Sequence, residues 1–158
     1  MSLQTELAEL FRRDMTRLTQ ELALFPGDDY LWKTLPGVKN AAGNITLHLE
    51  GNLRNYIGHH LGGIPYQRDR DFEFSAKGMP ASGLIARIDA LKPLIPNIIE
   101  TLPDAKLDEL FPEAMWGAPR ITRLFLIHLY GHFNMHLGQI GYLRRILTEG
   151  EAAKHAQL

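Results

Sequence analysis

The sequence has 158 residues, a length that suits one folded domain with a substantial core. Its 45% hydrophobic and 22% charged residues are ordinary for a globular protein, and a net charge of −1 gives no field that would attract nucleic acid or an anionic membrane. There is no cysteine, which excludes disulfides, thiolate zinc sites and cysteine nucleophiles.

The charged first segment, MSLQTELAELFRRD, is unlike a signal peptide. No run of about 18 apolar residues, the length of a membrane span, occurs. Basic residues pair only at 12–13 and 144–145, so we expect no nucleic-acid surface. These observations predict a cytoplasmic protein that binds neither membrane nor nucleic acid.

The first predicted element is an amphipathic helix over residues 3–25, where apolar residues recur at intervals of three and four. Ser2 is expected to cap this helix, and the pair Pro26-Gly27 to end it. The second predicted helix carries NITLHLEGNLRNYIGHHL. It begins either with Asn44 as its N-cap or near Lys39.

The polar stretch IPYQRDRDFEFSAKGMP follows, and it is too charged for a core strand and too long for a tight turn. We interpret it as a long crossover. The third predicted helix covers residues 81–101, with a kink or break near residue 92 because of Pro93 and Pro96. After a second irregular stretch, the fourth helix is predicted over residues 120–149.

Four long amphipathic helices bury their apolar stripes best against one another. The sequence therefore predicts an all-α fold, a four-helix bundle with a long crossover between helices two and three. Residues 1–158 are expected to form a single domain, with residues 151–158 as a flexible tail.

The fourth predicted helix places histidines in its most apolar segment, FLIHLYGHFNMHLGQIGYLRRIL. His132 and His136 are four residues apart, so their Cβ atoms lie about 5–6 Å apart on one face. Two such imidazoles can bind one metal ion at about 2.0–2.1 Å each. Without a third ligand, however, they bind it weakly. His48, which interrupts the apolar face of the second helix, is the best candidate for a third ligand. The alternative is that all three are hydrogen-bonded core residues.

The other histidines are harder to assign. His128 is interpreted as an alternative ligand, a hydrogen-bond donor behind the ligands or a stacked core residue. His59 and His60, near a helix end, and His155, in the charged tail, are expected to be exposed to solvent.

Three glycines interrupt the fourth helix at positions 131, 138 and 141. Each costs about 1 kcal/mol of helix stability relative to alanine. We expect the close approach of a facing helix to offset this cost. Access for a ligand and relief of crowding beside an aromatic side chain are the alternatives.

The run HFNMHLGQIGYLRRIL, with the upstream histidine of NITLHLEGNLRNYIG, resembles the DinB/YfiT-like superfamily of small bacterial helical proteins. The resemblance extends from the first helix to Leu147. It implies a four-helix bundle, and members often bind a divalent metal through one histidine of the second helix and two of the fourth. Carried over to this sequence, the ligands are His48, His132 and His136.

Two further positions compare with that family. Gln139 matches its glutamine, for which a packing role is favoured over support of a ligand. Met135 stands where many relatives have a further histidine next to the second ligand, so any role of that histidine is absent here.

Three neutral imidazoles would leave a coordination position of the metal open, unlike a closed structural zinc site. The first functional hypothesis is a metal-dependent enzyme that activates a thiol or water for transfer to, or hydrolysis of, a small electrophile. Zinc or nickel is the expected metal, and iron also suits imidazole ligands. The resemblance implies a low-molecular-weight thiol as a second cofactor, a small-molecule substrate and a homodimer.

The second hypothesis is a non-catalytic helical bundle that acts as a stress-associated binding or dimerisation module. The Glu-x-x-His motif of di-iron bundles and the His-Glu-x-x-His motif of metalloproteases are both absent. No residue stands out as a catalytic acid or base.

Overall fold

The structure, a computed structural model, describes residues 1–153. Within this range the only β pairing consists of isolated bridges between residues 110 and 121, so the predicted all-α fold is confirmed. None of these helices is both long and apolar enough to cross a bilayer. The elements in chain order are α1 (Leu3–Ala23), η1 (Asp28–Trp32), α2 (Ala42–Asn52), η2 (Leu53–His59), α3 (Arg70–Ser75), α4 (Ala81–Asp89), α5 (Leu94–Glu100), α6 (Asp104–Asp108) and α7 (Thr122–Thr148).

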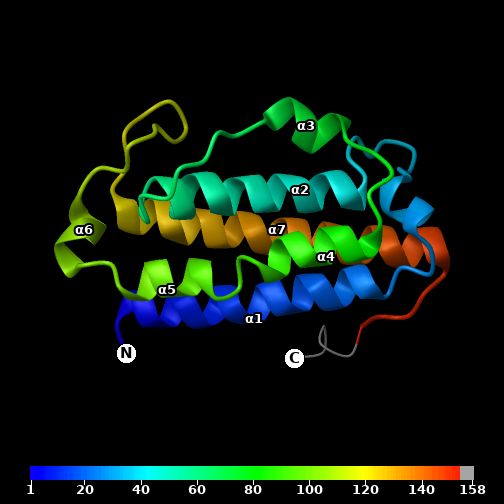
Figure 1. The fold of residues 1–158 in the computed structure, drawn as a ribbon, viewed down its shortest axis with the longest axis horizontal. Helices are drawn as coiled ribbons and strands as arrows, with labels where there is room; N and C mark the ends of the chain where they lie inside the picture. Colours follow the sequence, from blue (N-terminus) through cyan, green and yellow to red (C-terminus); the bar gives the residue numbers. More distant parts are fainter. Residues whose placement is uncertain (154–158) are drawn as a thin grey trace.

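Four helical rods lie side by side in Figure 1: α1, α2 continued by η2, α4 followed by α5, and α7. The rod of α4 and α5 packs on α1, and α7 contacts both α1 and α2. Each fully buried large apolar side chain contributes about 1.5–3 kcal/mol to stability. The largest such side chains come from all four rods and include Phe11, Met15, Leu18, Leu22, Leu49, Ile57, Leu84, Ile88 and Phe133.

Several predicted helix ends are close to the observed ones. The side chain of Ser2 caps α1 as expected, because its Oγ accepts a hydrogen bond from the backbone N–H of Thr5 at 3.3 Å. The third predicted helix is broken into α4 and α5 at residues 90–93. Pro93 has no backbone N–H, so it cannot continue the hydrogen bonds of α4. Residues 53–59 form a π-helix, η2, which the sequence pattern did not predict.

The segment 60–80 returns along α2 in Figure 1, and α3 packs on α2. As a result, α4 begins at the same end of the bundle as α2. The suggested N-cap role of Asn44 is wrong, because α2 begins at Ala42 with Ala41 as its N-cap. The Asn44 side chain instead holds the crossover: its Nδ2 donates to the carbonyl oxygens of Glu73 and Ala76 at 3.1 and 3.0 Å.

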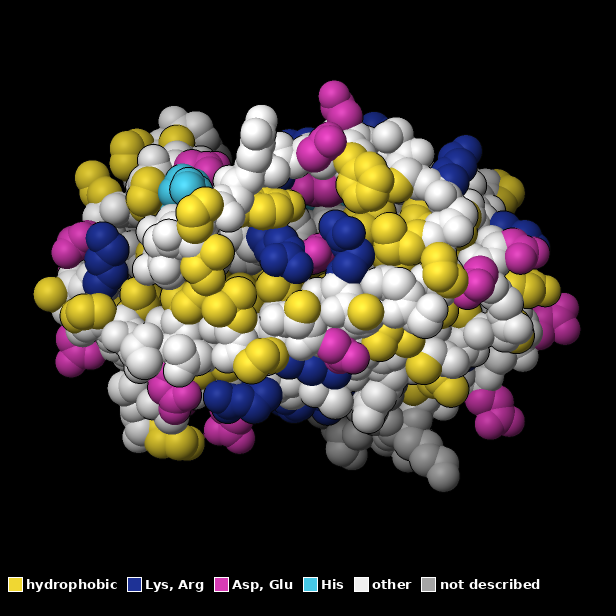
Figure 2. All heavy atoms as spheres, in the orientation of Figure 1, with side chains coloured by type: hydrophobic (Ala, Val, Ile, Leu, Met, Phe, Trp, Pro, Cys, Tyr) yellow, Lys and Arg dark blue, Asp and Glu magenta, His cyan; other side chains and the backbone are white. Residues whose placement is uncertain are grey.

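The C-terminal segment was expected to be a flexible tail from residue 151. Residues 154–158, which include His155, lie outside the described residues. Before them, Ala153 is buried, and the carbonyl oxygen of Glu151 accepts a hydrogen bond from Arg144 Nη2 at 2.9 Å. Figure 2 shows one face of the molecule, on which acidic and basic side chains are interspersed.

A buried carboxylate joins α1 to α7. Asp14 is completely inaccessible to solvent and accepts hydrogen bonds from Tyr130 Oη at 2.7 Å, Arg13 Nε at 2.8 Å and Arg17 Nη1 at 3.2 Å. Burial alone would raise the pKa of Asp14. The hydrogen bonds from Arg13 and Tyr130 outweigh burial and lower this pKa below its ordinary value of 3.8.

We expect Asp14→Asn to lower the stability of the fold and to make that stability depend less on pH in the acid range. The folded pKa lies below the unfolded one, so the ionised carboxylate stabilises the fold above about pH 4, and this contribution is lost as the pH falls through the folded pKa. The free energy of unfolding of the variant should be lower than that of the wild type by about 1–3 kcal/mol near neutral pH. It should also fall less steeply as the pH is lowered. Urea unfolding followed by circular dichroism over a pH series measures both effects. Asp71→Asn, on the exposed side of α3, is the control, and equally steep declines in Asp14→Asn and wild type would refute the assignment.

Candidate metal centre

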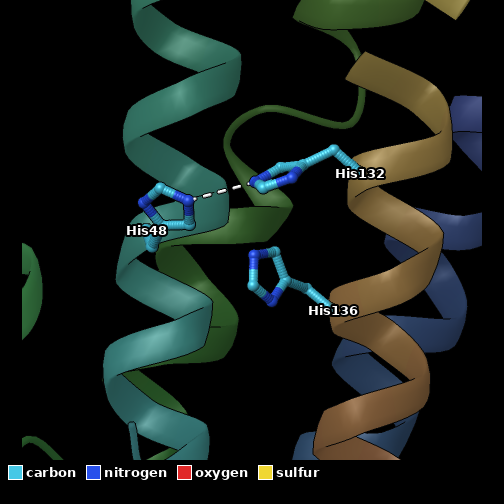
Figure 3. A group of neighbouring side chains, drawn as sticks. All are labelled: His48, His132 and His136. Carbon is cyan, nitrogen blue, oxygen red and sulfur yellow. Dashed lines mark hydrogen bonds between the residues drawn. The ribbon is translucent and has the colours of Figure 1, made fainter. Parts of the chain in front are cut away.

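The structure brings together the three histidines that the sequence singles out. His48 projects from α2, and His132 and His136 project from α7, with their rings directed at one another (Figure 3). One ring nitrogen of each lies within 4.8 Å of the other two. His48 Nε2 and His132 Nε2 are 3.1 Å apart. His48 is buried and the other two are half-buried, so the cluster lies at the edge of the core.

The ring of His48 is oriented by a carboxylate. Its Nδ1 lies 3.0 Å from Glu73 Oε2, to which it donates a hydrogen bond. This leaves Nε2 with the free electron pair, and Nε2 faces His132 and the side-chain amide of Asn52 at 3.2 Å. A carboxylate behind a histidine is the usual way in which proteins fix the ring and tautomer of a metal ligand.

Glu73 is itself held in place by Arg68. The guanidinium binds the carboxylate in a bidentate manner, with Nε to Oε1 at 2.7 Å and Nη2 to Oε2 at 2.9 Å, and its Nη1 donates to Tyr56 Oη at 3.2 Å. Burial alone would raise the pKa of Glu73, but the hydrogen bonds from His48 and Arg68 lower it overall. Glu73 is therefore ionised and acts as a hydrogen-bond acceptor at neutral pH.

A glycine in α2 makes room for this carboxylate. A Cβ atom at position 51 would lie 2.1 Å from Glu73 Oε1, a distance that no side chain tolerates. Glu73, Arg68 and Gly51 were missed by the sequence analysis. The one local signal was Gly51 itself, a glycine inside a helix and three residues after His48, hence on the same face.

His136 is oriented by Gln139. Its Nδ1 donates to Gln139 Oε1 at 2.7 Å, which leaves Nε2 as the available nitrogen. Gln139 is exposed, so the favoured packing role is wrong. Its contact with His136 has the geometry expected for the alternative, support of a ligand. Two of the three imidazoles are thus fixed through their Nδ1 atoms by acceptors in the same chain.

The environment keeps the half-buried imidazoles neutral. Burial is the main cause that lowers the pKa of His132 to about 4, followed by the other histidines of α2 and α7. Burial likewise lowers the pKa of His136. Neutral imidazole is the form that binds a metal ion, so three converging nitrogens with oriented rings fit a divalent cation.

His128 does not join this cluster. Its ring packs edge-on against Trp116, with 4.9 Å between ring centroids, and lies 6.1 Å from the ring of His132. His59 is exposed as predicted. The predicted exposure of His60 is wrong, because His60 is partly buried and its Nε2 contacts the carboxylate of Glu113.

The glycines of α7 differ from one another. A Cβ at position 141 would lie 3.1 Å from Glu21 Oε1 of α1, in keeping with the expected approach of a neighbouring helix. At Gly131 and Gly138 a Cβ would have no neighbour within 4 Å, and both residues are exposed. For these two positions the expected close contact within the bundle is wrong.

Two clefts flank the histidine cluster. The cleft beside His136 has a volume of about 440 Å³ and a mainly apolar lining that includes Leu35, Val38, Ile45 and Tyr142. The cleft beside His48 and His132 has a volume of about 330 Å³ and includes the polar side chains of Asn52, Tyr56, Arg70 and His128. Small molecules can therefore reach the cluster from two sides that differ in polarity.

Comparison with protein-family models gives no match, and neither does comparison with curated proteins. Among solved structures, the chain is similar to the crystal structure of a DinB-like protein from Bacillus cereus. The TM-score is 0.67 at 16% sequence identity, and the match covers 89% of each chain. At this identity the likeness shows a shared fold, which is the all-α fold expected from the sequence.

Proposed function

We propose that this chain, which has the fold of a DinB-like protein, is a metal-dependent enzyme with His48, His132 and His136 as the metal ligands. The observation that supports it most is the pair of acceptors behind the cluster. Glu73 and Gln139 each take the Nδ1 proton of one imidazole and so direct its Nε2 toward the other rings. An ordinary buried histidine also needs an acceptor for its N–H. What favours a metal over that alternative is the combination of these acceptors with ring nitrogens of all three histidines within 4.8 Å of one another.

Three protein ligands leave room for an exogenous one. When bound, zinc, nickel or iron would act as a Lewis acid and lower the pKa of a thiol or water toward neutrality. The protein supplies the orientation of the rings through Glu73 and Gln139, and burial keeps His132 neutral. The Asn52 amide and the Tyr56 hydroxyl, both in the polar cleft, can hydrogen-bond a ligand beside the cluster.

We propose transfer of a low-molecular-weight thiol to a small electrophile as the reaction, with hydrolysis as the variant in which water replaces the thiol. The thiol would lose its proton to solvent water, and its sulfur would bond to the electrophilic carbon while the leaving group departs with the bonding electrons and is protonated by solvent. Two clefts of different polarity on either side of the histidines would allow both reactants to bind at once. Such thiols are kept reduced in the cytosol, so the proposal places the protein there.

We expect protein purified without a histidine tag to contain about one equivalent of divalent metal and to melt at a lower temperature after chelation. A ligand with a Kd one-hundredth of its concentration stabilises a fold by about 2.7 kcal/mol. Elemental analysis and thermal melts with and without chelator measure the two effects. A panel of thiols and halogenated or epoxide electrophiles then tests turnover. Metal binding without turnover on the panel would favour the non-catalytic bundle, and absence of metal would refute the site.

A further inference from the structure

The apolar cleft beside His136 is built from three segments of the chain. One wall comes from α7, another side from the start of α2, and the opposite wall from the loop between η1 and α2. Its volume of about 440 Å³ lies within the range of about 300–1,000 Å³ that is usual for small-molecule sites. The apolar side chains of its lining are Leu35, Val38, Ile45, Tyr142, Leu143 and Ile146.

The apolar lining is graded from buried to exposed. Ile45 and Leu143 are buried, whereas Val38, Tyr142 and Ile146 are 38%, 64% and 58% exposed. The buried side chains therefore form the floor of the cleft, and the exposed ones form its rim. Single exposed apolar residues are ordinary on a protein surface, but several that surround one cleft indicate a binding site for an apolar group.

The loop wall of the cleft is fixed by a tight turn. Residues 35–38 form a β-turn, closed by a hydrogen bond from the backbone N–H of Val38 to the carbonyl oxygen of Leu35 at 2.9 Å. Gly37, the third residue of this turn, has a φ of 79°, which glycine adopts without strain. Because a β-turn brings its first and fourth residues within about 7 Å, Leu35 and Val38 line the cleft together.

The charge of the lining is positive. Among residues 1–153, no aspartate or glutamate lines the cleft, and Lys39 is its one formally charged residue. Lys39 is exposed and has no carboxylate partner in that part of the chain. A second cation lies at the rim, because the guanidinium carbon of Arg145 is 4.4 Å from the centre of the Tyr142 ring. The rim therefore favours a ligand with a negative charge.

The cleft connects this rim with the candidate metal centre. His136 belongs to its lining, and the ring of His136 faces the other two histidines (Figure 3). A ligand that lies on the apolar floor can thus place one end beside the histidines and the other end beside Lys39. The polar cleft approaches the same histidines from the side of His48 and His132.

We propose that the apolar cleft binds a small amphipathic anion, which is an aryl or alkyl group that carries a carboxylate or a sulfonate. The apolar group lies on Ile45 and Leu143, and the anionic group meets Lys39 at the rim. The role of this anion rests on the proposed function: it is the electrophile, and the thiol binds in the polar cleft beside Asn52 and Tyr56. Binding of the anion itself requires no metal.

Two fluorescent dyes with the same ring system test the cleft. Anilinonaphthalene sulfonate carries an anionic group, and phenylnaphthylamine lacks it. Titration of chelator-treated protein gives the Kd of each dye and excludes binding of the sulfonate to a metal. The wild type should bind one equivalent of the anionic dye about two- to fivefold more tightly than the neutral dye, the range of an exposed ion pair. Added salt should reduce this preference.

Two pairs of variants assign the dyes to this cleft. Lys39→Met should abolish the preference for the anionic dye, and Lys77→Met, at an exposed lysine of the crossover, should retain it. Ile146→Asp should weaken both dyes about tenfold, because the cleft loses an apolar contact and gains a carboxylate. Ile127→Asp is its control, since Ile127 is 47% exposed on the same helix and lies outside the cleft.

Circular dichroism confirms that the four variants are folded. Unchanged affinities in Ile146→Asp would show that the dyes bind elsewhere and would overturn the proposal. A wild type without preference for the anionic dye, or a preference that survives Lys39→Met, would overturn the assignment of the anion to Lys39.

A pair of electrophiles separates this inference from the proposed function. Chloromethylbenzoate and benzyl chloride both react with a thiol by loss of chloride, but only the first carries a carboxylate. The metal-loaded protein should have the lower KM for chloromethylbenzoate, and Lys39→Met should raise that KM without changing kcat. Turnover with equal KM values would refute the electrophile's place in the apolar cleft and leave the proposed function standing. Dye binding without any turnover would refute the proposed reaction and still support the cleft as a site for amphipathic anions.

Discussion

Replacing His132 by alanine is expected to reduce bound metal from about one equivalent to less than a tenth. His132 faces His48 at 3.1 Å between Nε2 atoms, so its loss leaves two ligands on opposite rods. Changes behind a ligand already weaken metal affinity about 10–100-fold, and loss of a ligand from a set of three should exceed that range. Elemental analysis of untagged protein and competition with a chromogenic chelator measure the loss.

His128→Ala is the matched control for this experiment. His128 lies one turn before His132 on the same helix and packs against Trp116 outside the cluster. Its metal content should equal that of the wild type. Equal metal loss in both variants, or full metal content in His132→Ala, would contradict the assignment of ligands.

The second large effect is expected at Glu73, which is not one of the three candidate ligands but holds one of them. Glu73→Ala should weaken metal affinity about 10–100-fold, because the ring and tautomer of His48 are no longer fixed. It should also destabilise the fold by about 3 kcal/mol, since Arg68, only 10% exposed, loses its bidentate partner. Calorimetric titration of the apoprotein measures the affinity, and urea unfolding with chelator present measures the metal-independent loss.

A pair of glycine variants tests the position of Glu73 without removing any polar group. Gly51→Ala leaves every polar group in place but drives a methyl group into Glu73 Oε1, so it should weaken metal binding and lower stability together. Gly58→Ala, in the same rod, meets only the carbonyl oxygen of Leu53 at 3.8 Å and should be neutral or slightly stabilising. If Gly51→Ala binds metal as the wild type does, Glu73 does not control the orientation of His48.

The rods and the histidine cluster could be predicted because their signals are local. The 3.6-residue period marks α1, and the prolines mark the break between α4 and α5. The spacing of His132 and His136 alone puts them on one face. Including His48 in the cluster required the further assumption that the second and fourth helices pack against each other. The contact between α2 and α7 confirms this assumption.

The remainder of the site depends on how the crossover folds back. Glu73 belongs to a charged stretch that resembles any solvated loop, and only the docking of α3 on α2 buries it. The contact predicted at Gly131 and Gly138 of α7 was wrong for another reason. Apolar residues occur almost all around that helix, so periodicity could not distinguish the face that packs in the bundle from the face that carries Met135 and Tyr142.

The hydrogen bonds that place Glu73 beside His48 lie within residues 68–76 of the crossover. Asn44 anchors its backbone, and Gly51 receives Glu73. Residues inserted beside the exposed Pro65 would extend exposed chain, and each doubling of a loop costs only about 0.6 kcal/mol in closure entropy. The other end of the crossover is held, because the carbonyl oxygen of Met79 accepts a hydrogen bond from Trp32 Nε1. We therefore expect an insertion beside Pro65 to leave Glu73 in contact with His48.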